Sequence, residues 1–185
     1  MVEIKRYEEK YRDDVRYVCL NSEGPCTWSD KKQQIILTTF CDYFIEKEGH
    51  NCFVAVDEND RAVGYILCAE NYDNFKKVFR KEYVTQFRKY DLVGRAVAVF
   101  STFIQARLRK KYPAHMHIDI LPEYQRMGLG HRLVDALCEN LKSKGVKGVC
   151  LTMFAGNEKG GNFYRKYGFT LIKTIFSTAI FSLEL

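Results

Sequence analysis

The stretch Pro122-Glu123-Tyr124-Gln125-Arg126-Met127-Gly128-Leu129-Gly130 stands between a strand-like segment, residues 114–121, and a helix-like segment, residues 129–144. Its glycines remove side chains where a ligand must approach the backbone. The first turn of the following helix leaves N–H groups without intrahelical partners, and their dipoles point the same way. We therefore predict an anion site here, suited to a pyrophosphate, with Arg126 and Arg132 adding charge-assisted contacts.

Other interpretations of this stretch are weaker or excluded. The glycines could serve only to let the helix pack closely against its surroundings. A P-loop is excluded because no Gly-Lys-Ser/Thr sequence follows. The dinucleotide-binding pattern also fails, since Leu133 stands where its third glycine is required.

Composition sets the limits on the rest of the chain. Its 185 residues, 46% hydrophobic and 28% charged, predict a single globular domain over residues 1–185. The net charge of +6 is too small to indicate nucleic acid. Seven cysteines contain no Cys-x-x-Cys pair, so we expect neither a disulfide framework nor a zinc site, and a cytoplasmic protein. No secretory leader or membrane span is predicted.

Hydrophobic periodicity predicts an α/β fold around a mixed sheet, in the order β-α-α-β-β-α-α-β-α-β-α-β. The expected strands are residues 2–7, 52–57, 62–69, 114–121 and 146–154, with one or two more in 171–185. The expected helices are residues 8–20, 30–48 (capped by Ser29, with an apolar face that includes Phe40), two within 71–111 separated by Gly94, 129–144 and 157–167.

The segment 71–111 allows three interpretations. Aromatic residues recur there at steps of three or four, with lysines and arginines between them: Tyr72, Phe75, Phe79, Tyr83, Phe87 and Tyr90. Such a stripe is typical of a helix that covers a sheet. It could instead form a wall of a substrate pocket. Base stacking on the stripe, with the basic run 107–111 holding phosphates, is the third interpretation.

Polar side chains alternate along the strand 114–121. His115, His117 and Asp119 project from one face of it, because side chains alternate along a strand. A polar face on a central strand indicates a cavity, and an imidazole is suited to proton transfer near neutral pH. Hydrogen bonds from the histidines to each other, to Asp119 or to a neighbouring strand are an alternative. A metal site is another, but no fourth ligand is evident, and we predict none.

Two motifs together resemble one family. Residues 122–130, followed by Leu133, resemble the acetyl-CoA-binding signature of the GCN5-related N-acetyltransferase (GNAT) family. The later pattern Asn157-x-x-Gly160-x-x-Phe163-Tyr164-x-x-x-Gly168-Phe169 is similar to its second signature. The resemblance covers residues 110–175. It implies a mixed, mostly antiparallel sheet with splayed central strands, flanked by helices, and acetyl-CoA as co-substrate.

The resemblance also implies roles for residues. Backbone N–H groups of residues 126–131 would hold the pyrophosphate, and an N–H near Ile120 or Leu121 would polarise the acetyl carbonyl. The cofactor-binding residues implied are Ile120, Leu121, Gln125, Arg126, Met127, Gly128, Leu129, Gly130, His131 and Asn157. Tyr164 would protonate the departing thiolate, and His117, Asp119 or water would take the proton of the amine. Asn157 could instead merely cap a helix, and Tyr164 could be a core aromatic.

The expected function is transfer of an acetyl group from acetyl-CoA to a primary amine by direct attack. Cys138 and Cys150 lie in apolar patterns and are interpreted as core residues rather than nucleophiles. The acceptor is a small molecule or a peptide, and a homodimer through the C-terminal strands is expected by family analogy. The alternatives are a non-catalytic CoA-binding module, with its acceptor side blocked by residues 71–111, and a nucleic-acid-binding protein.

Overall fold

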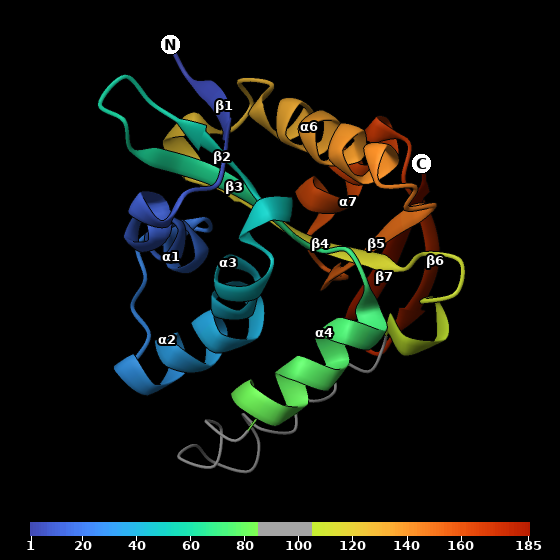
Figure 1. Cartoon of the computed structure of the whole chain (residues 1–185). Helices are drawn as coiled ribbons and strands as arrows, with labels where there is room; N and C mark the ends of the chain where they lie inside the picture. Colours follow the sequence, from blue (N-terminus) through green and yellow to red (C-terminus); the bar gives the residue numbers. More distant parts are fainter. Residues whose placement is uncertain (85–104) are drawn as a thin grey trace.

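A sheet of seven strands runs through the described part of the chain. The computed structural model describes residues 1–84 and 105–185, and the strands follow the order β1-β2-β3-β4-β5-β7-β6 (Figure 1). The strands are β1 (Glu3–Arg6), β2 (Phe53–Val56), β3 (Ala62–Ala69), β4 (Ala114–Ile120), β5 (Gly148–Phe154), β6 (Thr170–Ile175) and β7 (Thr178–Glu184). The predicted α/β class is confirmed.

Neighbouring strands are antiparallel except at the centre of the sheet. There β4 and β5 are parallel, and they pair only at Ala114↔Val149 and His115↔Cys150. Beyond these two pairs the strands separate, although β4 continues to Ile120 and β5 to Phe154. The implied splay of the central strands is therefore confirmed.

Helices cover both faces of the sheet. The helices α1 to α4 lie on one side and α6 on the other (Figure 1), and α7 packs beside α6 through the 2.6 Å hydrogen bond from Tyr167 Oη to Asp135. The α-helices are α1 (Arg12–Asn21), α2 (Asp30–Leu37), α3 (Tyr43–Lys47), α4 (Tyr72–Val78), α6 (Leu129–Ser143) and α7 (Glu158–Tyr167). Short 3₁₀ turns span Glu9–Tyr11, Gly49–Asn51, Gln105–Arg107 and Pro122–Tyr124.

The helix predicted over residues 30–48 is present but irregular, because α2, a π-helical turn and α3 follow one another without a break from Asp30 to Lys47. A π-helical turn, Thr38–Asp42, separates α2 from α3. Inside it the Thr39 hydroxyl donates to the Ile35 carbonyl at 2.7 Å, a bond that competes with regular helix geometry. Ser29 does precede α2, but its side chain makes no cap hydrogen bond. The π turn leaves Phe40 only half-buried, whereas Tyr43 and Phe44 are fully buried.

The aromatic stripe belongs to the core as far as the structure describes it. Tyr72, Phe75, Phe79 and Tyr83 are all buried, and the ring of Phe75 lies 4.8 Å from that of Tyr43. The helical path continues beyond α4, which ends at Val78, through a π-helical turn, Phe79–Tyr83, so the predicted helix is present as far as the structure describes it before residue 85. Phe87, Tyr90 and Gly94 lie outside the described residues, and of the second predicted helix only the 3₁₀ turn at 105–107 is described.

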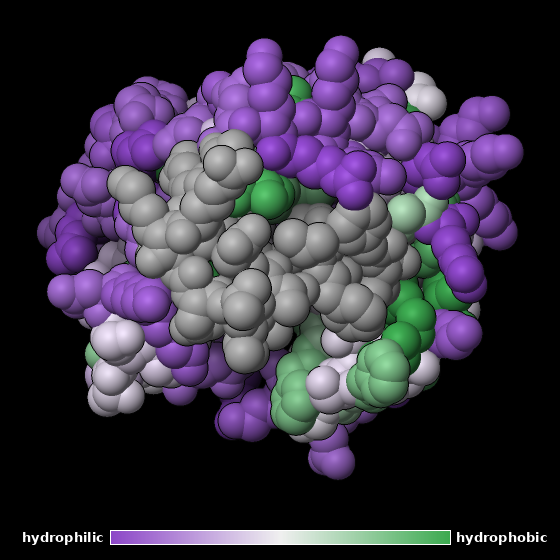
Figure 2. Space-filling model, turned by 90° about the horizontal axis from the view of Figure 1, so that it is seen from below, coloured by the Kyte–Doolittle hydropathy of each residue, from purple (hydrophilic) through white to green (hydrophobic). Residues whose placement is uncertain are grey.

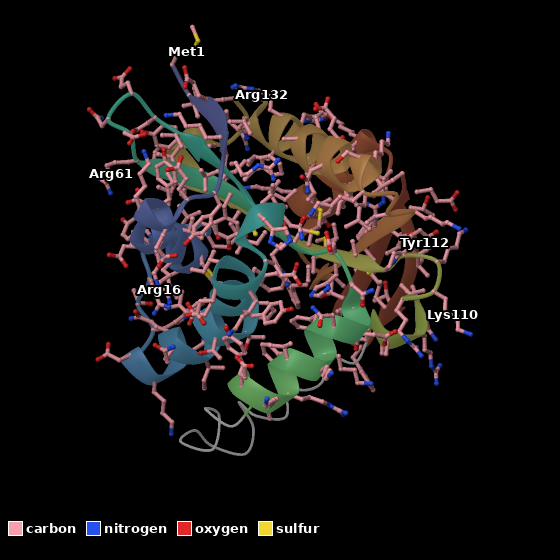
Figure 3. All side chains as sticks on the ribbon, viewed as in Figure 1. Met1, Arg16, Arg61, Lys110, Tyr112 and Arg132 are labelled. Atoms are coloured by element: carbon pink, nitrogen blue, oxygen red, sulfur yellow. The ribbon has the colours of Figure 1, made fainter. Side chains whose placement is uncertain are left out.

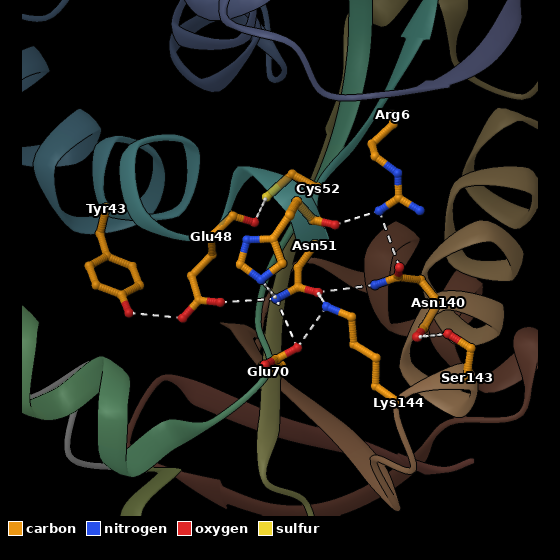
Figure 4. A network of polar contacts seen from close by, with 10 residues as sticks. Arg6, Tyr43, Glu48, Asn51, Cys52, Glu70, Asn140, Ser143 and Lys144 are labelled. Carbon is orange, nitrogen blue, oxygen red and sulfur yellow. Dashed lines mark hydrogen bonds and ion pairs between the residues drawn. The ribbon is translucent and has the colours of Figure 1, made fainter.

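A polar network joins α3, β3 and α6 (Figure 4). At its centre Asn51 is fully buried, and its side-chain oxygen accepts from Lys144 at 2.5 Å and from Asn140 at 3.1 Å. The same lysine donates to Glu70 at 2.9 Å, while buried Glu48 accepts from Asn51 at 3.0 Å. Buried polar groups need such partners, so the network fixes how the N-terminal half meets α6.

The surface shows little that favours nucleic acid. Figure 2 shows a face that is mostly hydrophilic outside the grey atoms, with hydrophobic residues gathered along one side. In the basic run 107–111, Arg109 pairs with Asp73 at 3.0 Å and Lys111 with Glu184 at 2.5 Å, which offsets part of its charge. Within residues 1–84 and 105–185 we find no helix long and apolar enough to cross a bilayer.

Candidate active site

A cavity of about 880 Å³ occupies the gap between β4 and β5. Its walls come from the end of α1 and the loop that follows, the π turn before α3, both splayed strands, and the facing sides of α6 and α7. Ten of the residues expected from the sequence line it: His117, Asp119, Ile120, Gln125, Arg126, Gly128, Gly130, His131, Asn157 and Tyr164. The structure therefore brings the loop and the proposed proton-handling groups together around one space.

The loop before α6 has the backbone expected of an anion site. Arg126 and Gly128 both adopt left-handed backbone conformations, with φ of 62° and 77°. Such turns direct successive N–H groups into one concavity, and Gly128 directly precedes the first turn of α6. Leu129 is buried and anchors the helix, whereas the side chain of Met127 points to solvent. Neither side chain lines the cavity, so their contribution is confined to the backbone.

The two glycines of the loop have different tasks. Gly128 needs its left-handed φ, and a Cβ there would meet nothing within 4 Å. At Gly130 a Cβ would lie 2.9 Å from the ring of Phe163 on α7. Close packing of helices, the alternative considered for the motif, thus applies to Gly130, while Gly128 permits the left-handed turn of the loop.

We expect Gly130→Ala to lower the free energy of unfolding by about 1–3 kcal/mol, because Phe163 must move to admit the methyl group. Denaturant unfolding measures the change. The matched control is Gly161→Ala, where the added Cβ meets only the flexible end of Arg165 at 3.2 Å, and no loss is expected. Equal stability of the Gly130 variant and the parent protein would contradict the packing role.

One backbone N–H at the end of β4 faces the gap. Leu121 N–H donates to the Val63 carbonyl at 3.0 Å, so it already has a partner on β3. In an antiparallel ladder the bonding direction alternates, and Ile120, opposite Gly64, therefore directs its N–H away from β3 toward β5. Its carbonyl accepts from Gln125 Nε2 at 2.9 Å, which fixes the turn. Of the two predicted donors, Ile120 is the one aimed into the cavity.

Asp119 has a buried carboxyl on the wall of the cavity. It accepts a hydrogen bond from the Tyr65 hydroxyl across the β3–β4 ladder and lines the cavity. Burial raises the pKa of this carboxyl to about 6, against the opposing effect of hydrogen bonds from Tyr65 and Ser22. Asp119 is thus ionised at neutral pH, yet more basic than an ordinary aspartate.

The two histidines of β4 differ in their surroundings. His117 lines the cavity beside Phe40, with ring centroids 5.3 Å apart, and burial lowers its pKa to about 4. His115 is deeply buried among aromatic rings, 4.3 Å from Phe75, and its pKa is also lowered by burial. Both imidazoles are therefore neutral at neutral pH, and His115 does not reach the cavity. No metal-binding group of three His, Cys, Asp or Glu side chains is found among the described residues.

Tyr164 stands on α7 opposite Asp119. Its ring packs against Phe163, Phe169 and Phe181, so it is partly the core aromatic considered above, but it also lines the cavity. Burial raises the pKa of its phenol, and the negative charge of Asp119 raises it further. The phenol therefore stays protonated near neutral pH and can donate a hydrogen bond, whereas a role as phenolate is excluded.

Asn157 makes the helix cap considered as its alternative role. Its side-chain oxygen accepts from Gly160 N–H at 2.9 Å, and its amide group lies 3.5 Å from Glu23 on the loop after α1. Because it also lines the cavity, capping and ligand contact are compatible here. Arg132, in contrast, donates to the Val2 carbonyl at 3.0 Å beside β1 (Figure 3) and does not line the cavity.

The cysteine predictions and several unforeseen residues complete the site. Cys150 is buried, its Sγ lies 3.5 Å from the Ala114 carbonyl oxygen, and burial raises its pKa to about 12, which removes it as a nucleophile. Cys138 is also buried with a raised pKa. The lining residues that sequence analysis did not assign to the site include Cys19, Ser22, Glu23, Phe40, Phe154, Lys159 and Lys166. For these residues the sequence offers one signal, the helical spacing of Lys159 and Lys166, which places both lysines on one side of α7.

Comparison with known proteins agrees with this geometry. The sequence model of the Acetyltransferase (GNAT) family matches residues 16–169, which is most of the chain. The chain belongs to the GNAT family. Like other GNAT proteins it is an acetyltransferase with acetyl-CoA as co-substrate, as the sequence resemblance implied.

Solved structures share the GNAT fold over the whole chain. SsHAT superposes with a TM-score of 0.89 at 23% identity, covering 99% of this chain and 98% of that one. The PaiA N-acetyltransferase from Thermoplasma acidophilum, in complex with coenzyme A, superposes with a TM-score of 0.62 at 16% identity, covering 100% of this chain and 99% of that one. The Drosophila melanogaster polyamine N-acetyltransferase, which forms N-acetylagmatine, gives 0.65 at 14% identity, covering 100% of both. At these identities the likeness shows the fold alone.

The residues present fit the co-substrate of a GNAT enzyme. A left-handed turn with N–H groups directed outward suits its pyrophosphate. The gap between β4 and β5, with the Ile120 N–H directed into it, suits an extended amide-bearing arm. When bound, acetyl-CoA supplies the activated acetyl group as a thioester.

Proposed function

We propose that this acetyltransferase transfers the acetyl group to a small primary amine by direct attack, without an acyl-enzyme. The observation that carries the proposal is the continuous cavity from the anion loop to Asp119 and Tyr164. The burial of Cys138 and Cys150 supports direct attack. Two carboxylates, Glu23 and Asp119, also line the cavity and favour a cationic acceptor.

Each group of the chain has a task in this reaction. Ionised Asp119 attracts the ammonium form of the acceptor and takes its proton, which leaves a neutral nitrogen as nucleophile. The Ile120 N–H donates to the oxygen on which charge develops, a type of contact worth ~2.7–4 kcal/mol elsewhere. Tyr164 donates its phenolic hydrogen bond to the leaving sulfur, and His117 stays neutral beside Phe40.

Small amines are the acceptor class we favour. Enzymes of the same fold include an agmatine N-acetyltransferase and a polyamine N-acetyltransferase, which are named for small cationic amines. The two carboxylates that line the cavity are consistent with that class. A cytoplasmic location, where acetyl-CoA and reduced thiols coexist, agrees with seven unpaired cysteines.

Incubation with acetyl-CoA and a panel of amines, followed by mass spectrometry, tests the proposal. We expect mass gains of one acetyl group on diamines and other cationic small amines, and none on neutral alcohols. Calorimetric titration of CoA into the same protein is run in parallel. Binding of CoA without product on any amine would favour a non-catalytic CoA-binding module, and absence of binding would refute the proposal.

A further inference from the structure

One face of α7 presents cations to the cavity. Lys159, Asn162 and Lys166 are spaced by three and four residues, which places them along the same side of the helix, and all three line the cavity. Within residues 1–84 and 105–185, neither lysine forms an ion pair with a carboxylate. Five other lysines of the described chain do form such pairs, so these two are charges without an internal counterion.

The facing wall adds further cationic and aromatic groups. His131, in the first turn of α6, lies against the α7 rings of Phe163 and Tyr167, with centroids 5.3 and 5.5 Å apart. Arg126 lines the same cavity from the anion loop. The N-terminal turn of α6 and the lysine face of α7 thus approach each other across Phe163, whose ring touches Gly130.

The two cationic features differ in chemistry. The loop offers backbone N–H groups in a concavity, which suits a pyrophosphate held against the main chain. The lysines offer mobile ammonium groups, which suit a terminal phosphate carrying about two negative charges. A ligand that satisfies both must carry two separate phosphate groups on one nucleotide. Coenzyme A has this chemistry, with a pyrophosphate and a 3′-phosphate on its ribose.

We infer that Lys159 and Lys166, assisted by His131, bind the 3′-phosphate of the nucleotide and make this protein select coenzyme A over its dephospho form. The inference rests on the proposed function, because it needs the pyrophosphate in the loop. The inference assigns this specificity to two lysines of α7 that occupy variable positions, because neither signature motif specifies the residue there. The thioester end of the cavity is not involved.

Calorimetric titration with CoA and with 3′-dephospho-CoA tests the inference without any turnover. We expect the parent protein to bind CoA at least ~10-fold more tightly, because two charge-assisted contacts are lost with the phosphate. The double variant Lys159→Gln/Lys166→Gln should bind both ligands with the affinity that the parent shows for dephospho-CoA. Raising the salt concentration should reduce the preference of the parent.

A lysine away from the cavity gives the matched control. Lys173→Gln removes the same charge from an exposed position on β6 and should leave the preference intact. Thermal unfolding checks that the exposed α7 substitutions leave the fold intact. Equal affinity of the parent for both ligands, or equal weakening of both by the double variant, would overturn the inference while the proposed function stands. Binding of neither ligand would refute both.

Discussion

We expect Tyr164→Phe to lower kcat by about 10²-fold or more, the usual range for a positioned proton donor. The reason is that the departing thiolate loses its hydrogen-bond donor, while the phenyl ring still fills its place among Phe163, Phe169 and Phe181. The affinity for CoA should remain nearly unchanged, since the hydroxyl acts on the sulfur only as the thioester breaks. Steady-state kinetics and calorimetry on the same preparation measure the two quantities separately.

Another tyrosine of α7 provides the control. Tyr167→Phe removes a hydroxyl that bonds to Asp135 at 2.6 Å and that does not line the cavity. We expect this variant to keep its kcat. A Tyr164 variant with full turnover would remove this side chain from the mechanism, and a loss of CoA affinity equal to the loss in kcat would assign it to binding instead.

The second large effect is expected at Asp119. Below a pH of about 6 the carboxyl is protonated, so it can neither attract an ammonium group nor take its proton. The value of kcat/KM, corrected for the ammonium fraction of the amine, should therefore rise with pH through about 6 and level off above it. In Asp119→Asn we expect kcat/KM to fall by about 10²-fold and its rise with pH near 6, the acidic limb of the profile, to disappear. Pre-equilibrated assays across the pH range measure both.

His117 is the competing candidate for the base, and the pH profile distinguishes it from Asp119. Because burial lowers the pKa of His117 to about 4, a base at this position would give a limb near 4 rather than near 6. We expect His117→Gln to keep the limb of Asp119. Should the limb disappear in His117→Gln and persist in Asp119→Asn, the histidine would be the base and our assignment would be wrong.

Much of the sheet and the loop was predictable because local signals determine them. Gly145 and Gly168, with φ of 70° and 116°, end their helices in the left-handed conformation that glycine favours. The predicted bounds of α6 and α7 are therefore within one residue of the observed ones. Asp60 adopts a left-handed φ of 56° in the turn between β2 and β3, as turn chemistry indicated. The parallel contact of β4 and β5 followed from the family resemblance rather than from periodicity.

The remainder depended on tertiary contacts that periodicity does not encode. The π turn at 38–42 ends at Asp42, which forms a partly buried ion pair with Arg16 of α1, a contact far apart in the sequence. The choice between Ile120 and Leu121 required the register with β3. The pKa values of Asp119 and His117 follow from the depth of burial. An alternating strand pattern predicts which face a side chain occupies but not how deeply that face is buried.

The break in the ladder between β4 and β5 has a further physical consequence. A sheet that opens at its centre has two internal edges, and each edge exposes main-chain groups that an intact ladder would satisfy. An extended ligand with amide groups in this gap would supply the missing partners and join the halves β1–β4 and β5–β7. We therefore expect a coenzyme held there to hold the two halves of the sheet together, in addition to supplying the acetyl group.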